Sequence, residues 1–116
     1  MTGTTPPRLG LLQGTLDLLI LRTLVFGPAH GHQITRHIQS TSNDLLQIET
    51  GSLYPALHRL EARGLVAASW ELSDRGKRAR YYRLTRAGRK ALVEEHDKWE
   101  SFSRAMGLVL ASKEPA

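Results

Sequence analysis

The residues best suited to a chemical task form a basic stretch in the second half of the chain. Between Arg75 and Lys90 stand eight of the 16 Lys and Arg residues, with neither Asp nor Glu among them. Surface segments of soluble proteins usually mix both signs, so a run of one sign indicates an anionic partner. Guanidinium and ammonium groups bind phosphate oxygens, and the stretch therefore favours DNA over a merely solvated surface. The later residues Arg83, Arg86, Arg89 and Lys90 fit a solvated face equally well.

The types and spacing of the residues do not indicate a catalytic or metal-binding site. His30, His32 and His37 are separated by two and five positions, whereas two metal ligands on one helix face need a spacing of four. The chain has no Cys, which excludes thiolate ligands, disulfides and thiol catalysis. It also lacks the GxSxG, HExxH and P-loop motifs. We therefore expect no enzyme activity, no metal and no cofactor.

Size and composition predict one soluble domain. The chain has 116 residues, 41% of them hydrophobic, and a net charge of +5 that permits nucleic acid, anionic membrane or acidic protein as partner. Its longest apolar stretch, Leu16–Phe26, is interrupted by Asp17 and Arg22 and is too short and polar to span a bilayer. The polar segment Met1–Pro7 has no signal-peptide pattern. We expect a cytoplasmic protein with no membrane partner.

Hydrophobic periodicity and capping residues predict four helices. The first is apolar on nearly every face and is stopped by Gly27-Pro28, whereas the second has Ile34 and Ile38 as its buried stripe. Thr85 is placed to cap the last helix. The predicted helices span 14–26, 32–40, 50–63 and 86–110.

A β-hairpin and one short strand complete the predicted elements. Segment 45–49 alternates weakly and is consistent with a strand. Segment 66–72 alternates clearly, the turn lies at 74–77, and the return strand puts Tyr82 and Leu84 on one face. Tyr82 is predicted to lie in the core.

This order of elements predicts a mainly α fold with a small β-hairpin, namely a winged helix-turn-helix followed by a C-terminal dimerisation helix. Residues 1–10 are expected to be a disordered lead, 11–85 the winged-helix DNA-binding domain and 86–112 the dimerisation helix. In such folds the third helix enters the major groove and the hairpin, or wing, lies over the flanking backbone.

The third helix and the wing supply the residues that such a task requires. Leu53, Leu57 and Leu60 share one helix face, so the opposite, polar half is free for the groove. The wing turn is basic, and Gly76 makes it flexible. The predicted DNA contacts are Gln33, Ser52, Tyr54, Pro55, His58, Arg59, Arg75, Lys77, Arg78 and Arg80.

Four stretches carry a family resemblance: residues 14–21 (GTLDLLIL), 30–34 (HGHQI), 50–66 (TGSLYPALHRLEARGLV) and 81–88 (YYRLTRAG). In these stretches the chain resembles the PadR family of bacterial transcriptional regulators, and its length is similar to that of the short subgroup. His32 departs from the pattern, since an aromatic residue is common there. The resemblance implies a homodimer, joined through the first and last helices, that represses transcription from a twofold operator and is released by a ligand or stress signal.

The last helix carries an apolar stripe with roughly a/d spacing. The stripe either packs on its own chain or forms a dimer seam, and we expect the seam because the first helix already supplies the monomer with apolar surface. The predicted dimerisation residues are Leu16, Leu19, Leu92, Trp99, Phe102, Met106 and Val109.

Trp99 is the candidate effector site. Some short PadR regulators carry a tryptophan at the matching place, and the resemblance implies that two such rings sandwich a small, flat, often cationic aromatic compound. Indole is suited to this because its face attracts cations and stacks on planar rings. The alternative is that Trp99 only fills the dimer core.

Two other function classes fit the sequence less well. A protein-binding winged helix would carry apolar residues on its third helix, where this chain has Arg59. A membrane-surface protein would flank the apolar face of one helix with Lys and Arg, whereas here they lie on a hairpin.

Overall fold

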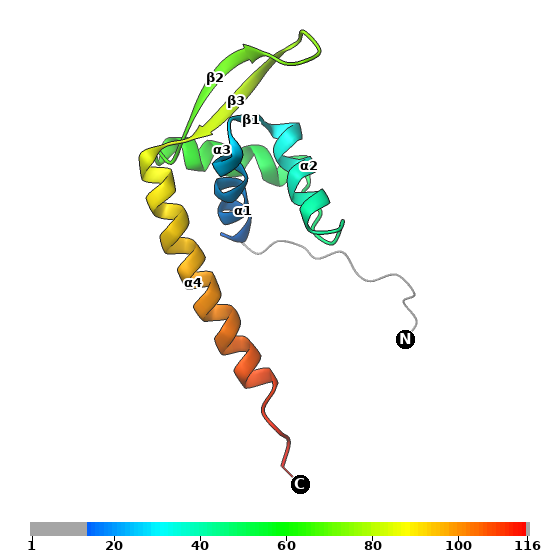
Figure 1. The fold of residues 1–116 in the computed structure, drawn as a ribbon, viewed down its shortest axis with the longest axis vertical. Coiled ribbons are helices and arrows are strands. Elements are labelled where there is room, and N and C mark those ends of the chain that lie inside the picture. Colours follow the sequence, from blue (N-terminus) through cyan, green and yellow to red (C-terminus); the bar gives the residue numbers. More distant parts are fainter. Residues whose placement is uncertain (1–13, 116) are drawn as a thin grey trace.

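Over residues 14–115, which the computed structural model describes, four α-helices and a small sheet form a winged domain from which the last helix projects (Figure 1). The helices are α1 (Thr15–Thr23), which continues as the short 3-10 helix η1 (Leu24–Phe26), α2 (Gly31–Thr41), α3 (Thr50–Ala62) and α4 (Arg86–Leu110). The strands are β1 (Ala29–His30), β2 (Val66–Leu72) and β3 (Arg78–Leu84). The predicted lead, 1–10, lies outside the described residues.

The sheet is antiparallel, with β3 in the middle in the order β1-β3-β2. Tyr82 is paired on both sides, with Ala29 of β1 and Ala68 of β2. Its side chain is only 2% exposed, as predicted, because the face of β3 that carries it packs on the helices. Strands β2 and β3 extend beyond this core as the wing, defined here as residues 66–84.

The core lies where α1, α2 and α3 meet the sheet. Leu53, Leu57 and Leu60 are buried, which confirms the predicted inner face of the third helix. The largest fully buried side chains come from all three helices and β3: Ile20, Leu21, Ile34, Leu57, Leu60 and Tyr82.

The predicted winged helix-turn-helix fold is confirmed, with two changes in its strands. The strand predicted at 45–49 is wrong, since within it only Leu46 makes a β-type bridge. Asn43 and Asp44 have φ values of 53° and 63°, so the chain turns through the left-handed region just before this segment. The small strand lies instead at β1, which precedes α2 and occupies the edge of β3.

The start of α4 is held tightly against the domain. The Thr85 hydroxyl accepts the Gly88 N–H at 3.0 Å, as the predicted cap requires, and donates to the Gly64 carbonyl at 2.7 Å. A Cβ atom at Gly88 would lie 2.0 Å from the Leu65 carbonyl oxygen, so no larger residue fits without movement. From Val93 to the end of the described chain, every residue is exposed. The molecule therefore measures 64 × 35 × 21 Å, with α4 as its long extension (Figure 1).

Candidate nucleic-acid interface

The outer face of α3 presents the residues that the sequence predicted. Ser52, Tyr54, Pro55, His58 and Arg59 are all exposed. Pro55 lies in the second turn of the helix, where its missing N–H removes one backbone hydrogen bond near the N-terminal end. The face is thus polar and accessible, while the leucines on the opposite side anchor it to the core.

Two of these residues are already engaged within the chain. Arg59 donates from Nη2 to Oδ1 of Asp17 in α1 at 2.9 Å, and its side chain keeps 49% exposure. Tyr54 lies against the N-terminus of α2, since a Cβ atom at Gly31 would be 2.7 Å from its hydroxyl. Both side chains are therefore oriented before any partner arrives. The guanidinium of Arg59 retains further donors.

Gln33 has a structural task at the start of α2. Its amide oxygen accepts the His30 N–H at 3.0 Å, and its own N–H donates to Nδ1 of His30 at 3.3 Å, forming a reciprocal cap. The side-chain NH₂ group has no part in this cap. Gln33 is exposed, so that group is available to a phosphate oxygen.

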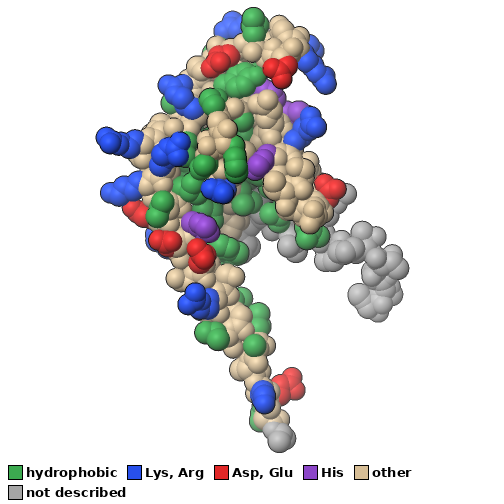
Figure 2. Space-filling view, viewed as in Figure 1, with side chains coloured by type: hydrophobic (Ala, Val, Ile, Leu, Met, Phe, Trp, Pro, Cys, Tyr) green, Lys and Arg blue, Asp and Glu red, His purple; other side chains and the backbone are tan. Residues whose placement is uncertain are grey.

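The wing tip carries accessible cations. Arg75, Lys77 and Arg78 are exposed, and none of the three forms an ion pair with another residue of the described chain. The tip is closed by the Ser73 N–H donating to the Lys77 carbonyl at 2.7 Å, and Gly76 provides the positive φ of 74° that the turn needs. Figure 2 shows Lys and Arg side chains along the wing and around the start of α4.

Arg80 differs from these cations because it ties the wing to α3. Its Nη2 donates to Oε2 of Glu61 at 2.7 Å, and its guanidinium lies 6.0 Å from the ring centres of both Trp70 and Tyr82. Its Nε is buried without a hydrogen-bond partner in the described structure. Burial raises the pKa of the Tyr82 hydroxyl, an effect that the nearby Arg80 charge opposes. Arg80, predicted as a DNA contact, thus has its charge largely engaged inside the chain.

The histidines do not converge on a metal site. Within residues 14–115, no three His, Cys, Asp or Glu side chains are close enough together to hold a metal ion. His30 packs its ring against Tyr81 and His32 instead, and His37 lies beside Phe26.

The seven residues predicted at a dimer seam differ in their exposure. Leu16 and Leu92 are buried within the single chain, so they leave almost no surface for a second subunit. Leu19 is half-buried. The four others are 42–71% exposed along α4: Trp99, Phe102, Met106 and Val109. Figure 2 shows hydrophobic side chains open on this part of the helix. In the described part of the chain, no helix has the length and hydropathy to cross a membrane.

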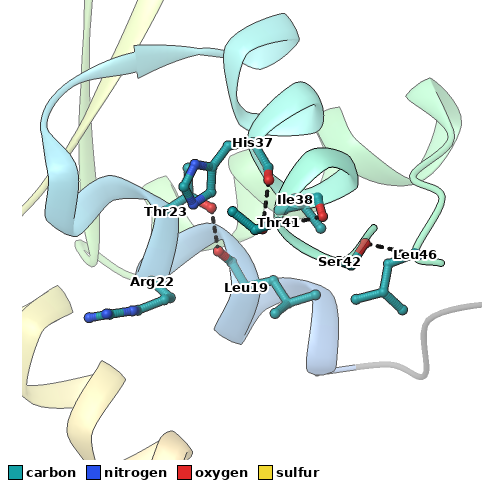
Figure 3. Close-up of a pocket in the computed structure, with 8 residues that line it drawn as sticks. All are labelled: Leu19, Arg22, Thr23, His37, Ile38, Thr41, Ser42 and Leu46. Atoms are coloured by element: carbon teal, nitrogen blue, oxygen red, sulfur yellow. Dashed lines mark hydrogen bonds between the residues drawn. The ribbon is translucent and has the colours of Figure 1, made fainter. Parts of the chain in front are cut away.

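A pocket of about 190 Å³ lies between α1 and α2 and not at Trp99 (Figure 3). Thr23 and Thr41 donate their hydroxyls to backbone carbonyls of their own helices, and the Ser42 hydroxyl accepts the Leu46 N–H. The pocket is smaller than the roughly 300–1,000 Å³ typical of sites for drug-sized ligands. It is lined by Leu19, Arg22, Thr23, His37, Ile38, Thr41, Ser42 and Leu46.

Several residues that orient the side chains of this interface could not be identified from the sequence. Asp17 and Glu61 orient Arg59 and Arg80, and Gly31 gives Tyr54 its place. Helical periodicity gives no signal for such contacts, because each partner lies on another element. A lone acidic residue in an apolar helix, as at Asp17, was the only available hint.

Comparison with known proteins agrees with this arrangement. Residues 20–94 match the family described as "Transcriptional regulator PadR-like family". The chain is 39% identical over 92 residues to a transcriptional regulator of Mycobacterium tuberculosis, covering 79% of this chain and 82% of that protein.

Solved structures of regulators share the fold. A transcriptional regulator from Clostridium thermocellum superposes with a TM-score of 0.75 and 29% identity, covering 82% of this chain and 92% of the other. A PadR family transcriptional regulator from Eggerthella lenta gives a TM-score of 0.74 and 32% identity, covering 87% and 86%. With its polar α3 face, its basic wing and this family match, the chain belongs to the PadR-like family of transcriptional regulators.

Proposed function

We propose that this regulator is a homodimeric repressor that binds a specific double-stranded DNA operator. The observation that carries the proposal is the exposed polar face of α3 beside a wing tip whose cations have no carboxylate partner in the described chain. The α3 side chains reach base edges in the major groove, and the wing cations contact phosphates. A bacterial regulator acts where its DNA lies, so we assign it to the cytoplasm.

The proposed contacts are of two kinds: readers, which contact base edges, and anchors, which bind phosphates. In this proposal Ser52, Tyr54, His58 and Arg59 read base edges, and Pro55 is exposed on the same helix. Arg75, Lys77 and Arg78 bind phosphates, with the NH₂ group of Gln33 as a further anchor at the start of α2. Phosphate contacts give affinity and salt dependence, whereas base contacts give sequence choice. Arg80 supports the wing from within.

The proposed dimer is joined by the exposed stripe of α4. Trp99, Phe102, Met106 and Val109 would meet their copies across a twofold axis, with Leu19 of α1 at the edge of the contact. Burying these side chains removes apolar surface that the single chain leaves in water. Two subunits then present two α3 helices about one helical turn of DNA apart, roughly 34 Å.

A mobility-shift assay tests the DNA-binding function. The labelled duplex carries the region upstream of the protein's own gene, and an unlabelled duplex of unrelated sequence serves as competitor. We expect a complex that survives this competitor and whose affinity falls steeply with salt. Equal competition by specific and unrelated duplexes would contradict operator recognition. Absence of any complex at low salt would exclude DNA binding altogether.

We further propose that Trp99 senses a small planar aromatic ligand at the dimer axis. Its ring lies 6.1 Å from that of Phe102 and is 42% exposed, so two chains would form an aromatic cavity. A ligand bound there changes operator affinity only if it binds more tightly to dimers with one spacing of the two α3 helices than to dimers with another.

A Trp70→Phe variant tests the ligand site, because Trp99 is then the only indole. Planar cationic dyes should quench its fluorescence saturably and weaken operator binding over the same concentration range. Emission that stays blue-shifted and indifferent to the dyes would mean that Trp99 only fills the dimer core.

A further inference from the structure

The wing carries a large aromatic side chain that the described part of the chain leaves uncovered. Trp70 is 57% exposed, although it lies in a regular strand. Its cross-strand partner is Arg80, and two positions closer to the core Ala68 pairs with the buried Tyr82. Since side chains alternate along a strand, Trp70 is on the same face as Tyr82. The indole therefore lies on the side of the wing turned toward α3, two pairs beyond the buried Tyr82.

Two guanidinium groups hold this indole in place. The Arg78 Cζ lies 5.4 Å from the ring centre and the Arg80 Cζ 6.0 Å. Cations at such distances are attracted to the ring face. Arg80 is fixed in turn by its 2.7 Å ion pair with Glu61 of α3. Helix α3, the Arg80 side chain and the Trp70 indole are thus connected by direct contacts.

The surface around Trp70 combines apolar and basic groups. Leu72, the next residue on this face, is 69% exposed, and its cross-strand partner is Arg78. Arg78 has no carboxylate partner in residues 14–115. A DNA backbone alternates anionic phosphates with apolar deoxyribose rings, so it matches this combination of groups. The patch is also continuous with the wing tip and the Glu61 edge of α3, where the proposed DNA interface lies.

We propose that Trp70 belongs to the DNA interface, where its indole packs against a deoxyribose next to the phosphate that Arg78 binds, and that the Glu61–Arg80 ion pair positions this contact. The proposal rests on the DNA-binding function and assigns to it a residue outside the α3 face and the wing tip. Trp70 contributes affinity from the flank and reads no base. Glu61 and Arg80 act as positioning residues.

Fluorescence of a Trp99→Phe variant, which keeps Trp70 as its single indole, tests the contact directly. Two duplexes are used: the upstream region of the gene and an unrelated sequence at low salt, with anisotropy of the labelled DNA reporting the complex. We expect the Trp70 emission to shift to the blue and its quenching by acrylamide to fall in both complexes. A complex with unchanged Trp70 emission and quenching overturns the proposal. If the parent protein binds neither duplex, the DNA-binding function itself is overturned.

Affinity of matched variants gives a second readout. Trp70→Ala should weaken binding of both duplexes by about tenfold, roughly the lower end of aromatic contacts with nucleic acid, while Trp70→Phe keeps most of the affinity. The control is Phe26→Ala, which removes another exposed ring with an arginine, Arg22, 5.2 Å from its centre but outside the interface. That control should bind as the parent does. Equal binding by parent and Trp70→Ala would overturn the proposal.

Glu61→Gln separates positioning from charge. Removing a carboxylate near DNA should by itself strengthen binding, because one repulsion disappears. If Glu61 positions the wing, Glu61→Gln instead weakens binding and restores acrylamide access to Trp70 in the complex. In a Trp70→Ala background the same change should give no further loss, since coupled residues are not additive. Additive losses would contradict the positioning role.

Discussion

The two ends of this molecule satisfy opposite physical requirements. In the winged domain most large apolar side chains of α1, α2 and α3 are buried, and the exposed surface carries cations and polar residues together with a few apolar side chains such as Trp70 and Leu72. Along α4 beyond Leu92 the apolar residues Trp99, Phe102, Met106 and Val109 remain exposed. The first surface suits a polyanion, and the second suits another apolar helix. One chain therefore carries two interfaces of different chemistry, separated along its longest dimension.

Removing the exposed apolar part of α4 should have the largest effect. A chain truncated after Lys98 should lose its dimer, and operator affinity should fall by roughly a hundredfold or more, because two linked recognition helices bind far better than one. Analytical ultracentrifugation and the mobility shift measure the two effects. Truncation after Leu110 is the control and should leave both unchanged. A well-folded dimer from the shorter chain would refute the α4 seam.

Replacing glycine with alanine should have opposite effects on the free energy of unfolding at the buried start and at the exposed end of α4. Gly88→Ala places a methyl group against the Leu65 carbonyl and should lower the free energy of unfolding by about 2–3 kcal/mol. Gly107→Ala meets no atom within 4 Å in the described chain and should raise it by about 0.5–1 kcal/mol, as helix propensity predicts. Urea denaturation measures both. Equal destabilisation at the two sites would mean that another chain closes on Gly107.

In the winged domain, substitutions of base-reading residues and of phosphate-binding residues should differ in their effect on the salt dependence of DNA binding. Arg59→Ala should cost roughly 1–3 kcal/mol on the operator and little on unrelated DNA. Lys77→Ala should weaken both and reduce the salt slope by about one. Asp17→Asn is the control, since it breaks the ion pair but keeps the arginine. If Asp17→Asn matches Arg59→Ala in every assay, Arg59 acts through α1 and not on DNA.

The smallest predicted effect concerns Tyr82 in the core of the winged domain. Burial raises its pKa, so the folded state holds the phenolic proton more tightly than the unfolded chain does. This contribution to stability is complete below the ordinary tyrosine pKa of 10.0 and is lost as the pH rises toward the folded-state value. Denaturation of the parent and of Tyr82→Phe at several pH values measures it. The parent should lose more stability above pH 10.0 than the variant, and parallel curves would contradict the assignment.

Elements with a long repeat could be predicted from the sequence. The 3.6-residue spacing of Leu53, Leu57 and Leu60 defined the inner face of α3, and strict alternation defined β2. Strand β1 has two residues and thus no detectable period. Segment 45–49 shows partial alternation, but only Leu46 makes a β-type bridge, and β1 occupies the side of β3 opposite to β2.

The candidate site was predictable in its face but not in its partners. Position on the helix made Arg59 an exposed residue, yet its ion pair joins residues 42 positions apart. Arg80 and Glu61 are 19 positions apart, so their contact likewise depends on tertiary packing. Leu92 shared the apolar stripe with Trp99, and only the three-dimensional structure separates the buried residue from the exposed one.

The missing side chain at Gly88 has a mechanical consequence. With α4 pressed against the Leu65 backbone and capped by Thr85, the first turn of the helix cannot tilt independently of the domain. The 25 residues of α4 then behave as a lever arm of about 37 Å. A rotation of about 5° at the far end of such an arm moves the domain by about 3 Å, which is comparable to the spacing of one base pair. A stiff joint of this kind would convert small angular changes between two subunits into a change of register on DNA.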